Sequence, residues 1–112
     1  MKPEDRYAWL ENRIDEEGAG GVDTLNSQFV DDYIDATDAK FRFTNFGAYK
    51  CPQLGRDLST MFRAGRLRRS RLGLTDGAWQ PGFPTWVWCY SLPRYHRSTN
   101  TTKINKETAN GL

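Results

Sequence analysis

The chain has 112 residues, of which 38% are hydrophobic and four are tryptophan, so we expect one domain with one core. No apolar run approaches the roughly 20 residues of a membrane span, and the opening MKPEDRYAWLENR lacks an apolar signal core. We therefore expect a cytoplasmic protein with no membrane contact. Two cysteines and one histidine are too few for a usual zinc site, so we expect free thiols and no metal.

The net charge of +2 conceals a division of charge along the chain. Residues 1–40 carry 11 acidic and 4 basic residues, a balance of −7. Residues 41–112 carry 3 acidic and 12 basic residues, a balance of +9, with six arginines between Arg56 and Arg71. This asymmetry predicts one face that meets a polyanion. The alternative is that both halves are ordinary solvated surface.

A first helix is expected over residues 3–17, and the glycine-rich residues 18–21 end it. Its apolar side chains recur at spacings of three and four, which gives one stripe. The stripe comprises Tyr7, Trp9, Leu10 and Ile14. Because it lies outside the minimal domain described below, we expect it to form a dimer interface with a second copy.

A second helix is expected from about Thr24 or Asn26 to Asp38, with an Asp, Thr or Asn cap at its start. The segment that follows, residues 40–50, has the sequence KFRFTNFGAYK. Its phenylalanines fit a short strand or a turn wedged into the core, and Thr44-Asn45 followed by Gly47 favours the turn.

A third helix is expected over residues 51–64, because Leu54, Leu58, Met61 and Phe62 follow a helical period. Gly55 within it costs roughly 1 kcal/mol against alanine, which a close backbone contact would explain. The face left outside carries polar and basic side chains. These are Gln53, Arg56, Ser59, Thr60 and Arg63.

A β-hairpin is expected next. Residues 66–72 form an arginine-rich first strand, residues 73–84 a loop dense in glycine and proline, and residues 85–92 a return strand rich in aromatic residues. Alternation along the return strand places Trp86, Trp88 and Tyr90 on one face. Residues 93–112 are polar and without pattern, so we expect a disordered tail.

The segment from Leu54 to Arg69, with its leucine and methionine spacing followed by Ala-Gly-Arg-Leu and a further arginine, resembles the winged helix-turn-helix superfamily. The resemblance covers roughly residues 22–92 and implies an α+β fold of three helices followed by a β-hairpin wing. It implies that helix 51–64 is the recognition helix and that the 66–90 hairpin is the wing, with Trp79 and Gln80 at the wing tip. Residues 1–21 would then be an added N-terminal helix and turn.

The function that this resemblance implies is sequence-specific binding of double-stranded DNA by a small transcriptional regulator. A helix of this size fits the major groove, where arginine can reach guanine and asparagine or glutamine can reach adenine. The hairpin arginines are expected on phosphates, which position the protein without reading sequence. The candidate DNA-binding residues are Lys50, Gln53, Arg56, Ser59, Thr60, Arg63, Arg66, Arg68, Arg69 and Arg71.

Several alternatives remain open at this point. Arg63 and Arg66 can instead cap the negative end of the third helix, and Arg56 can pair with Asp57 or with an acid of the first half. The domain can also be a protein-interaction module, a phage or mobile-element factor that binds an acidic surface of a host protein. Binding of single strands would require a row of exposed tryptophans. No catalytic triad or phosphate loop is present in the sequence, so neither an enzyme nor a cofactor is expected.

Overall fold

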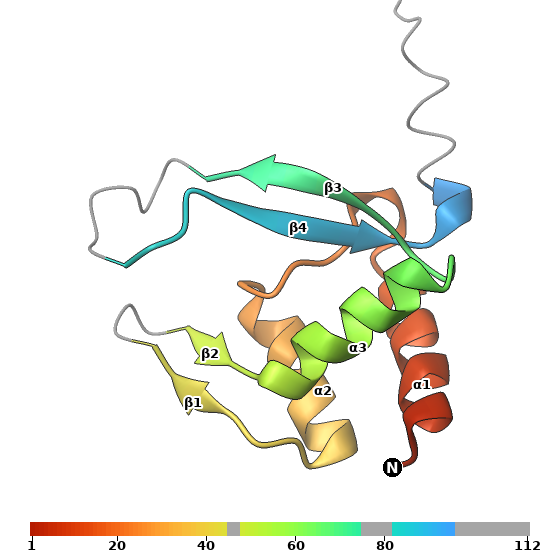
Figure 1. Cartoon of the computed structure of the whole chain (residues 1–112), viewed down its shortest axis with the longest axis horizontal. Helices are drawn as coiled ribbons and strands as arrows, with labels where there is room; N and C mark the ends of the chain where they lie inside the picture. Colours follow the sequence, from red (N-terminus) through yellow and green to blue (C-terminus); the bar gives the residue numbers. More distant parts are fainter. Residues whose placement is uncertain (45–47, 75–81, 96–112) are drawn as a thin grey trace, which may run out of the picture.

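The computed structural model describes residues 1–44, 48–74 and 82–95, and over these the fold is α+β (Figure 1). The elements in chain order are α1 (Pro3–Asp15), the 3₁₀ helix η1 (Gly18–Gly20), α2 (Ser27–Thr37), β1 (Arg42–Phe43), β2 (Tyr49–Lys50), α3 (Pro52–Arg63), β3 (Arg68–Gly73) and β4 (Trp86–Ser91). The three long helices lie together, and the β3–β4 hairpin lies above them in the view of Figure 1. The α+β class predicted from the sequence is confirmed.

The three predicted helices are confirmed, with slightly shorter ends than expected. Proline occupies the first turn of α1 and of α3, where its missing N–H costs nothing. Asn26 caps α2, because its side-chain oxygen accepts a hydrogen bond from the Phe29 amide at 3.1 Å. The close backbone contact expected at Gly55 is not found, since a Cβ added there would meet no described atom within 4 Å.

The apolar stripe of α1 packs into the chain's own core. Leu10 and Ile14 have no exposed surface, and they share the core with residues of α2, α3 and the hairpin. Trp9 packs edge-on against Tyr33 of α2, and Tyr7 lies under the guanidinium of Arg66. The expected dimer surface on α1 is therefore corrected: its two central side chains are not available to a second copy, and α1 is an integral part of the domain.

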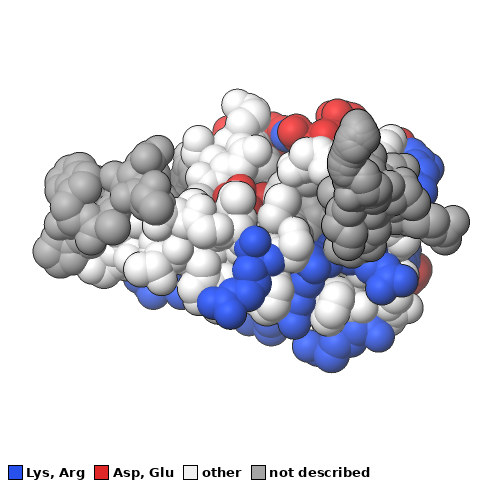
Figure 2. Space-filling view, turned by 90° about the horizontal axis from the view of Figure 1, so that it is seen from above, with Lys and Arg blue, Asp and Glu red and all other residues white. Residues whose placement is uncertain are grey.

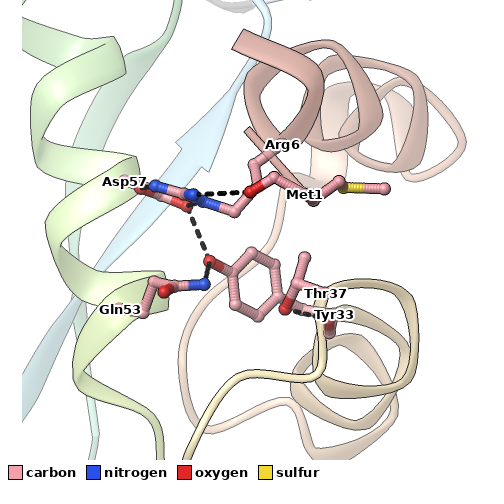
Figure 3. A network of polar contacts seen from close by, with 6 residues as sticks. All are labelled: Met1, Arg6, Tyr33, Thr37, Gln53 and Asp57. Carbon is pink, nitrogen blue, oxygen red and sulfur yellow. Dashed lines mark hydrogen bonds and ion pairs between the residues drawn. The ribbon is translucent and has the colours of Figure 1, made fainter. Parts of the chain in front are cut away.

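A buried polar network fixes the rotation of α3 against the other two helices (Figure 3). Asp57 of α3 is 3% exposed, and it accepts two hydrogen bonds from Arg6 of α1 and one from the Tyr33 hydroxyl of α2. Gln53, one turn earlier on α3, donates to the same hydroxyl at 3.0 Å. A buried carboxylate must be paired in this way, so Asp57 has to face α1 and α2.

The β3–β4 hairpin is antiparallel and is extended by one residue from the segment before α2. Arg71 lies opposite Trp88 in its register, and Val22 forms an isolated bridge with Tyr90. Gly21, which precedes the bridge, has a φ of 68°, and a Cβ there would lie 2.6 Å from the carbonyl oxygen of Tyr90. Glycine is required at this position because the two backbones approach so closely.

The segment after α2 forms a second small hairpin, β1–β2, in which Arg42 lies opposite Lys50 and Phe43 lies opposite Tyr49. The favoured expectation of a turn wedged into the core is corrected: the segment contains two short strands, and Phe41 and Phe43 are exposed. The expected wing-tip residues, Trp79 and Gln80, lie outside the described residues, as does most of the expected tail. Residues 93–95 differ from that expectation, because they form a helical turn in which Arg94 and Tyr95 contact Asp15.

Candidate nucleic-acid interface

The arginines of the described residues fall into two groups according to whether they meet a carboxylate. Arg6 pairs with Asp57, and Arg13 of α1 pairs with acids of α1 and α2. Arg66 is bound by both Glu4 and Glu11, and Arg94 pairs with Asp15. These four arginines hold α1 to the rest of the domain, so their charge is already neutralised.

The second group forms no ion pair with any described residue. Its members are Arg42, Arg56, Arg63, Arg68, Arg69 and Arg71. All six belong to β1, α3 and β3, the part of the chain in which Asp57 is the sole described acid after residue 40. Because Asp57 is buried against Arg6, its charge does not reach this surface.

Basic and acidic side chains gather on different edges of the face seen in Figure 2. Seen from above the β3–β4 hairpin, most of the visible Lys and Arg atoms lie along one edge, whereas the visible Asp and Glu atoms lie mostly along the opposite edge (Figure 2). The charge division along the sequence is therefore also a division in space. An uncompensated cationic edge of this kind attracts polyanions.

The outer face of α3 carries most of the side chains predicted for it. Arg56 and Arg63 are exposed, and Ser59 and Thr60 are partly exposed beside them. Gln53 differs, because its amide is engaged by the Tyr33 hydroxyl inside the network around Asp57. The pairing of Arg56 with Asp57 left open above is excluded by the same network, which directs Asp57 inward to Arg6.

Two arginines of β3 are held in place by aromatic rings. The guanidinium of Arg69 lies 4.0 Å from the ring centroids of both Phe62 and Trp88, and that of Arg71 lies 4.1 Å from Trp86. A stacked guanidinium keeps its N–H donors free at the ring edge while its plane is fixed by the cation–π contact. These two side chains are therefore pre-oriented donors for an anion.

The sequence places Trp86 and Trp88 on one face of the return strand but does not reveal their contact with the arginines. Trp86 is 37% exposed, and the two indoles meet edge to face at 5.0 Å. A signal was present, because Arg69 and Arg71 alternate along β3 in phase with the tryptophans of β4. Finding it required the register of the hairpin, which the long connecting loop obscures.

A groove of about 310 Å³ separates α3 from the inner face of the hairpin. Gly55 and Ser59 line it on the helix side, and Trp86 and Trp88 line it on the strand side. The tryptophans that line the groove are the ones on which Arg69 and Arg71 stack.

The remaining predicted DNA-binding residues also separate into those without an acidic partner and those with one. Lys50 is exposed at the end of β2 and Arg68 is exposed on β3, and neither pairs with a described acid. Arg66 is different, because its hydrogen bonds to Glu11 and Glu4 hold its guanidinium against α1 and raise its pKa. We therefore leave Arg66 and Gln53 out of the candidate interface.

Other kinds of site find no support in the described residues. No cluster of three or more His, Cys, Asp or Glu side chains in that part of the chain could hold a metal ion. Cys51 and Cys89 are free, and burial raises the pKa of both thiols, which disfavours the reactive thiolate. None of the described helices is long and apolar enough to cross a membrane.

Comparison with protein-family models, with curated proteins and with solved structures found no match to this chain. A functional argument therefore depends on the geometry of the site alone.

Proposed function

We propose that the protein binds double-stranded DNA with α3 in the major groove and the β3–β4 hairpin as a wing, as a small sequence-specific transcriptional regulator. The order of elements supports a winged helix-turn-helix assignment. A helix, a short bridged segment at Val22, two further helices and a hairpin follow one another, and the bridge joins Val22 to Tyr90 of the return strand. The β1–β2 hairpin between the second and third helices is an insertion in this scheme.

The observation that carries the proposal is the set of arginines without carboxylate partners on α3 and β3. Exposed cations on a folded domain are usually accompanied by acids that neutralise them, and here the acids are gathered on the opposite edge (Figure 2). Lys and Arg that neutralise phosphates release condensed counterions, which supplies affinity for any duplex.

Arg56 and Arg63 are the side chains proposed to read bases. Both are exposed on the outer face of α3, opposite the buried Leu54, Leu58 and Met61. A bidentate contact from arginine to guanine is worth about 1–3 kcal/mol of discrimination against another base. Ser59 and Thr60 can contact bases or phosphates from the same face.

Arg68, Arg69 and Arg71 are proposed to contact the phosphate backbone. They lie on β3, and the rings of Phe62, Trp86 and Trp88 orient two of them. Such contacts fix the register of the protein on the duplex and do not depend on sequence. Lys50, which lies just before α3, is a further candidate for a phosphate contact.

Selection from a library of random duplexes tests the proposal. The protein is expected to enrich a short motif, because α3 presents a fixed set of polar side chains to the groove. Retention of duplexes without enrichment of any motif would restrict the activity to non-specific binding, and failure to retain duplexes at low salt would exclude DNA as the partner.

The second candidate is a protein-interaction module that binds an acidic surface of another protein. Exposed aromatic side chains in β1 and just before it favour this function, since Phe41 is 46% and Phe43 is 63% exposed. Exposed aromatic residues beside free cations suit a protein partner as well as a nucleic acid. Salt-dependent binding to random duplex DNA separates the two functions, because a protein-interaction module need not show it.

A further inference from the structure

The β1–β2 hairpin places two cations directly opposite each other. Arg42 pairs in register with Lys50, both side chains are exposed, and neither forms an ion pair with a described residue. Like charges at directly opposed positions of an antiparallel pair destabilise it. A hairpin of only two paired residues on each strand has little other stabilisation to offset this, so the arrangement suits an anion between the two groups.

The other face of this hairpin is turned toward α2. Side chains alternate along a strand, so Phe43 and Tyr49 lie on the face away from the two cations. Their rings stack at 5.0 Å, and the Tyr49 hydroxyl is 3.5 Å from Asp31 of α2. Tyr49 thus anchors the hairpin to α2, and the two cations lie on the opposite face of the strands.

The cations line a cleft of about 630 Å³, which also includes residues just before and within β4. Thr24 lies at the same cleft, and its hydroxyl has no hydrogen-bond partner among the described residues. The facing wall is apolar and includes Pro84 and Val87. Phe43 and Tyr49 line the cleft as well, so it offers two positive charges and a hydroxyl beside apolar and aromatic surface that suits a sugar ring.

We propose that Arg42 and Lys50 bind a phosphate group of the DNA backbone in this cleft, next to the segment that α3 contacts. The inference rests on the proposed function and extends it to a second hairpin. Lys50 is two residues before Pro52, the first residue of α3, so a duplex bound by the helix passes close to the cleft. The β1–β2 hairpin then acts as a second clamp on the backbone, on the other side of α3 from Arg68 and Arg71.

The test is the salt dependence of duplex binding by single variants of the full chain. Arg42→Ala and Lys50→Ala are each compared with the wild type and with the matched control Lys2→Ala, which removes an exposed cation at the start of α1. Each cleft variant is expected to reduce the steepness of log affinity against log salt by up to about 0.9, the value for one phosphate contact on a duplex, because the two cations share one phosphate. The control variant is expected to leave the slope unchanged.

The outcomes separate this inference from the function on which it rests. Wild-type binding with slopes that fall in both cleft variants supports it. If the wild type binds and both cleft variants keep the same salt slope as Lys2→Ala, the proposed phosphate site in the cleft is wrong. Duplex binding by α3 would then still stand. If the wild type does not bind duplex DNA, both the proposed function and the proposed phosphate site are contradicted.

Free phosphate is the other source of the same chemistry, and a titration with inorganic phosphate followed by amide NMR distinguishes it. Saturable shifts at Thr24 and Lys50 below millimolar phosphate, together with unchanged duplex slopes, would assign the cleft to a small phosphate compound and overturn the assignment to DNA. Both variants are expected to remain folded by circular dichroism, because the two side chains are exposed.

Discussion

The guanidinium of Arg6 on α1 donates two hydrogen bonds to the carboxylate of Asp57 on α3, at 2.7 and 3.0 Å, across 51 residues of sequence. This pair determines which side of α3 faces the core, and therefore which side is left for a partner. Asp57 follows Arg56 directly in the sequence, yet Asp57 is buried and points toward Arg6 and Tyr33 (Figure 3), whereas Arg56 is exposed. The cationic face of α3 exists because its one acid is turned inward.

Replacement of Arg6 by alanine is expected to destabilise the fold strongly. Removing one partner of a buried ion pair leaves an uncompensated charge and costs about 3 kcal/mol or more. The free energy of unfolding from urea denaturation measures the change. Lys2→Ala, which removes an exposed cation four residues earlier, is the control and is expected to change stability by less than about 0.5 kcal/mol. Equal stability of the two variants would show that the Arg6–Asp57 pair does not hold α3.

Alkaline pH is expected to weaken the same network through Tyr33. Burial, and the hydrogen bond that its hydroxyl donates to Asp57, raise the pKa of Tyr33 above its ordinary value of 10.0. A raised pKa means that the folded state holds the proton more tightly, so this contribution is complete below pH 10.0 and is lost as the pH rises above it.

The measurement compares the unfolding free energy of the wild type and Tyr33→Phe between about pH 8 and about pH 11. The advantage of the wild type is expected to be constant at the lower values and to shrink above the ordinary pKa. Contributions from all other residues are common to the two proteins and cancel in the difference. If the stability advantage of the wild type grows with pH, the Tyr33 hydroxyl does not donate its proton to Asp57 as assigned.

Arg63 and Arg66 are three residues apart, and opposite effects are expected from their replacement. Arg66 is bound by Glu4 and Glu11, so Arg66→Ala is expected to lower stability by up to about 1 kcal/mol and to leave DNA affinity nearly unchanged. Arg63 is exposed without a described partner, so Arg63→Ala is expected to lower DNA affinity and to leave stability unchanged. Anisotropy and urea denaturation of each variant measure both quantities. The reverse pattern would place the interface on the α1 side.

Two double variants separate base reading from backbone contact. Arg56→Ala with Arg63→Ala is expected to abolish preference for the selected motif while random duplex still binds. Arg68→Ala with Arg71→Ala is expected to weaken binding to all sequences alike and to flatten the salt slope by about 2 units at most. Competition between the selected motif and a scrambled duplex measures preference. Retention of the motif preference by the α3 variant would contradict the assignment of α3 as the reading helix.

Local patterns predicted the elements that depend on neighbouring residues. The spacing of Leu54, Leu58 and Met61 predicted α3, and the aromatic run at residues 85–92 predicted β4, because periodicity of apolar side chains is a local property. The sequence does not distinguish the β1–β2 hairpin from a turn, because its strands are too short to give a periodic pattern. Its aromatic side chains resemble core residues in sequence, yet Phe43 is largely exposed.

The partners of charged side chains could not be predicted in the same way. Arg66 lies 55 residues from Glu11, and Arg6 lies 51 residues from Asp57, so both pairs follow from how the helices pack. The sequence showed a basic half and an acidic half. It did not show that the acids of α1 take Arg66 away from the basic face, or that tryptophans of β4 orient the arginines of β3.

The central claim is that the unpaired arginines of α3 and β3 form a surface for duplex DNA. Fluorescence anisotropy of a labelled random duplex of ~25 base pairs, titrated with the protein at several salt concentrations, tests it most directly. We expect micromolar affinity that falls steeply as salt rises. A folded sample that does not bind the duplex at low salt would contradict the claim and would direct the search to a protein with an acidic surface.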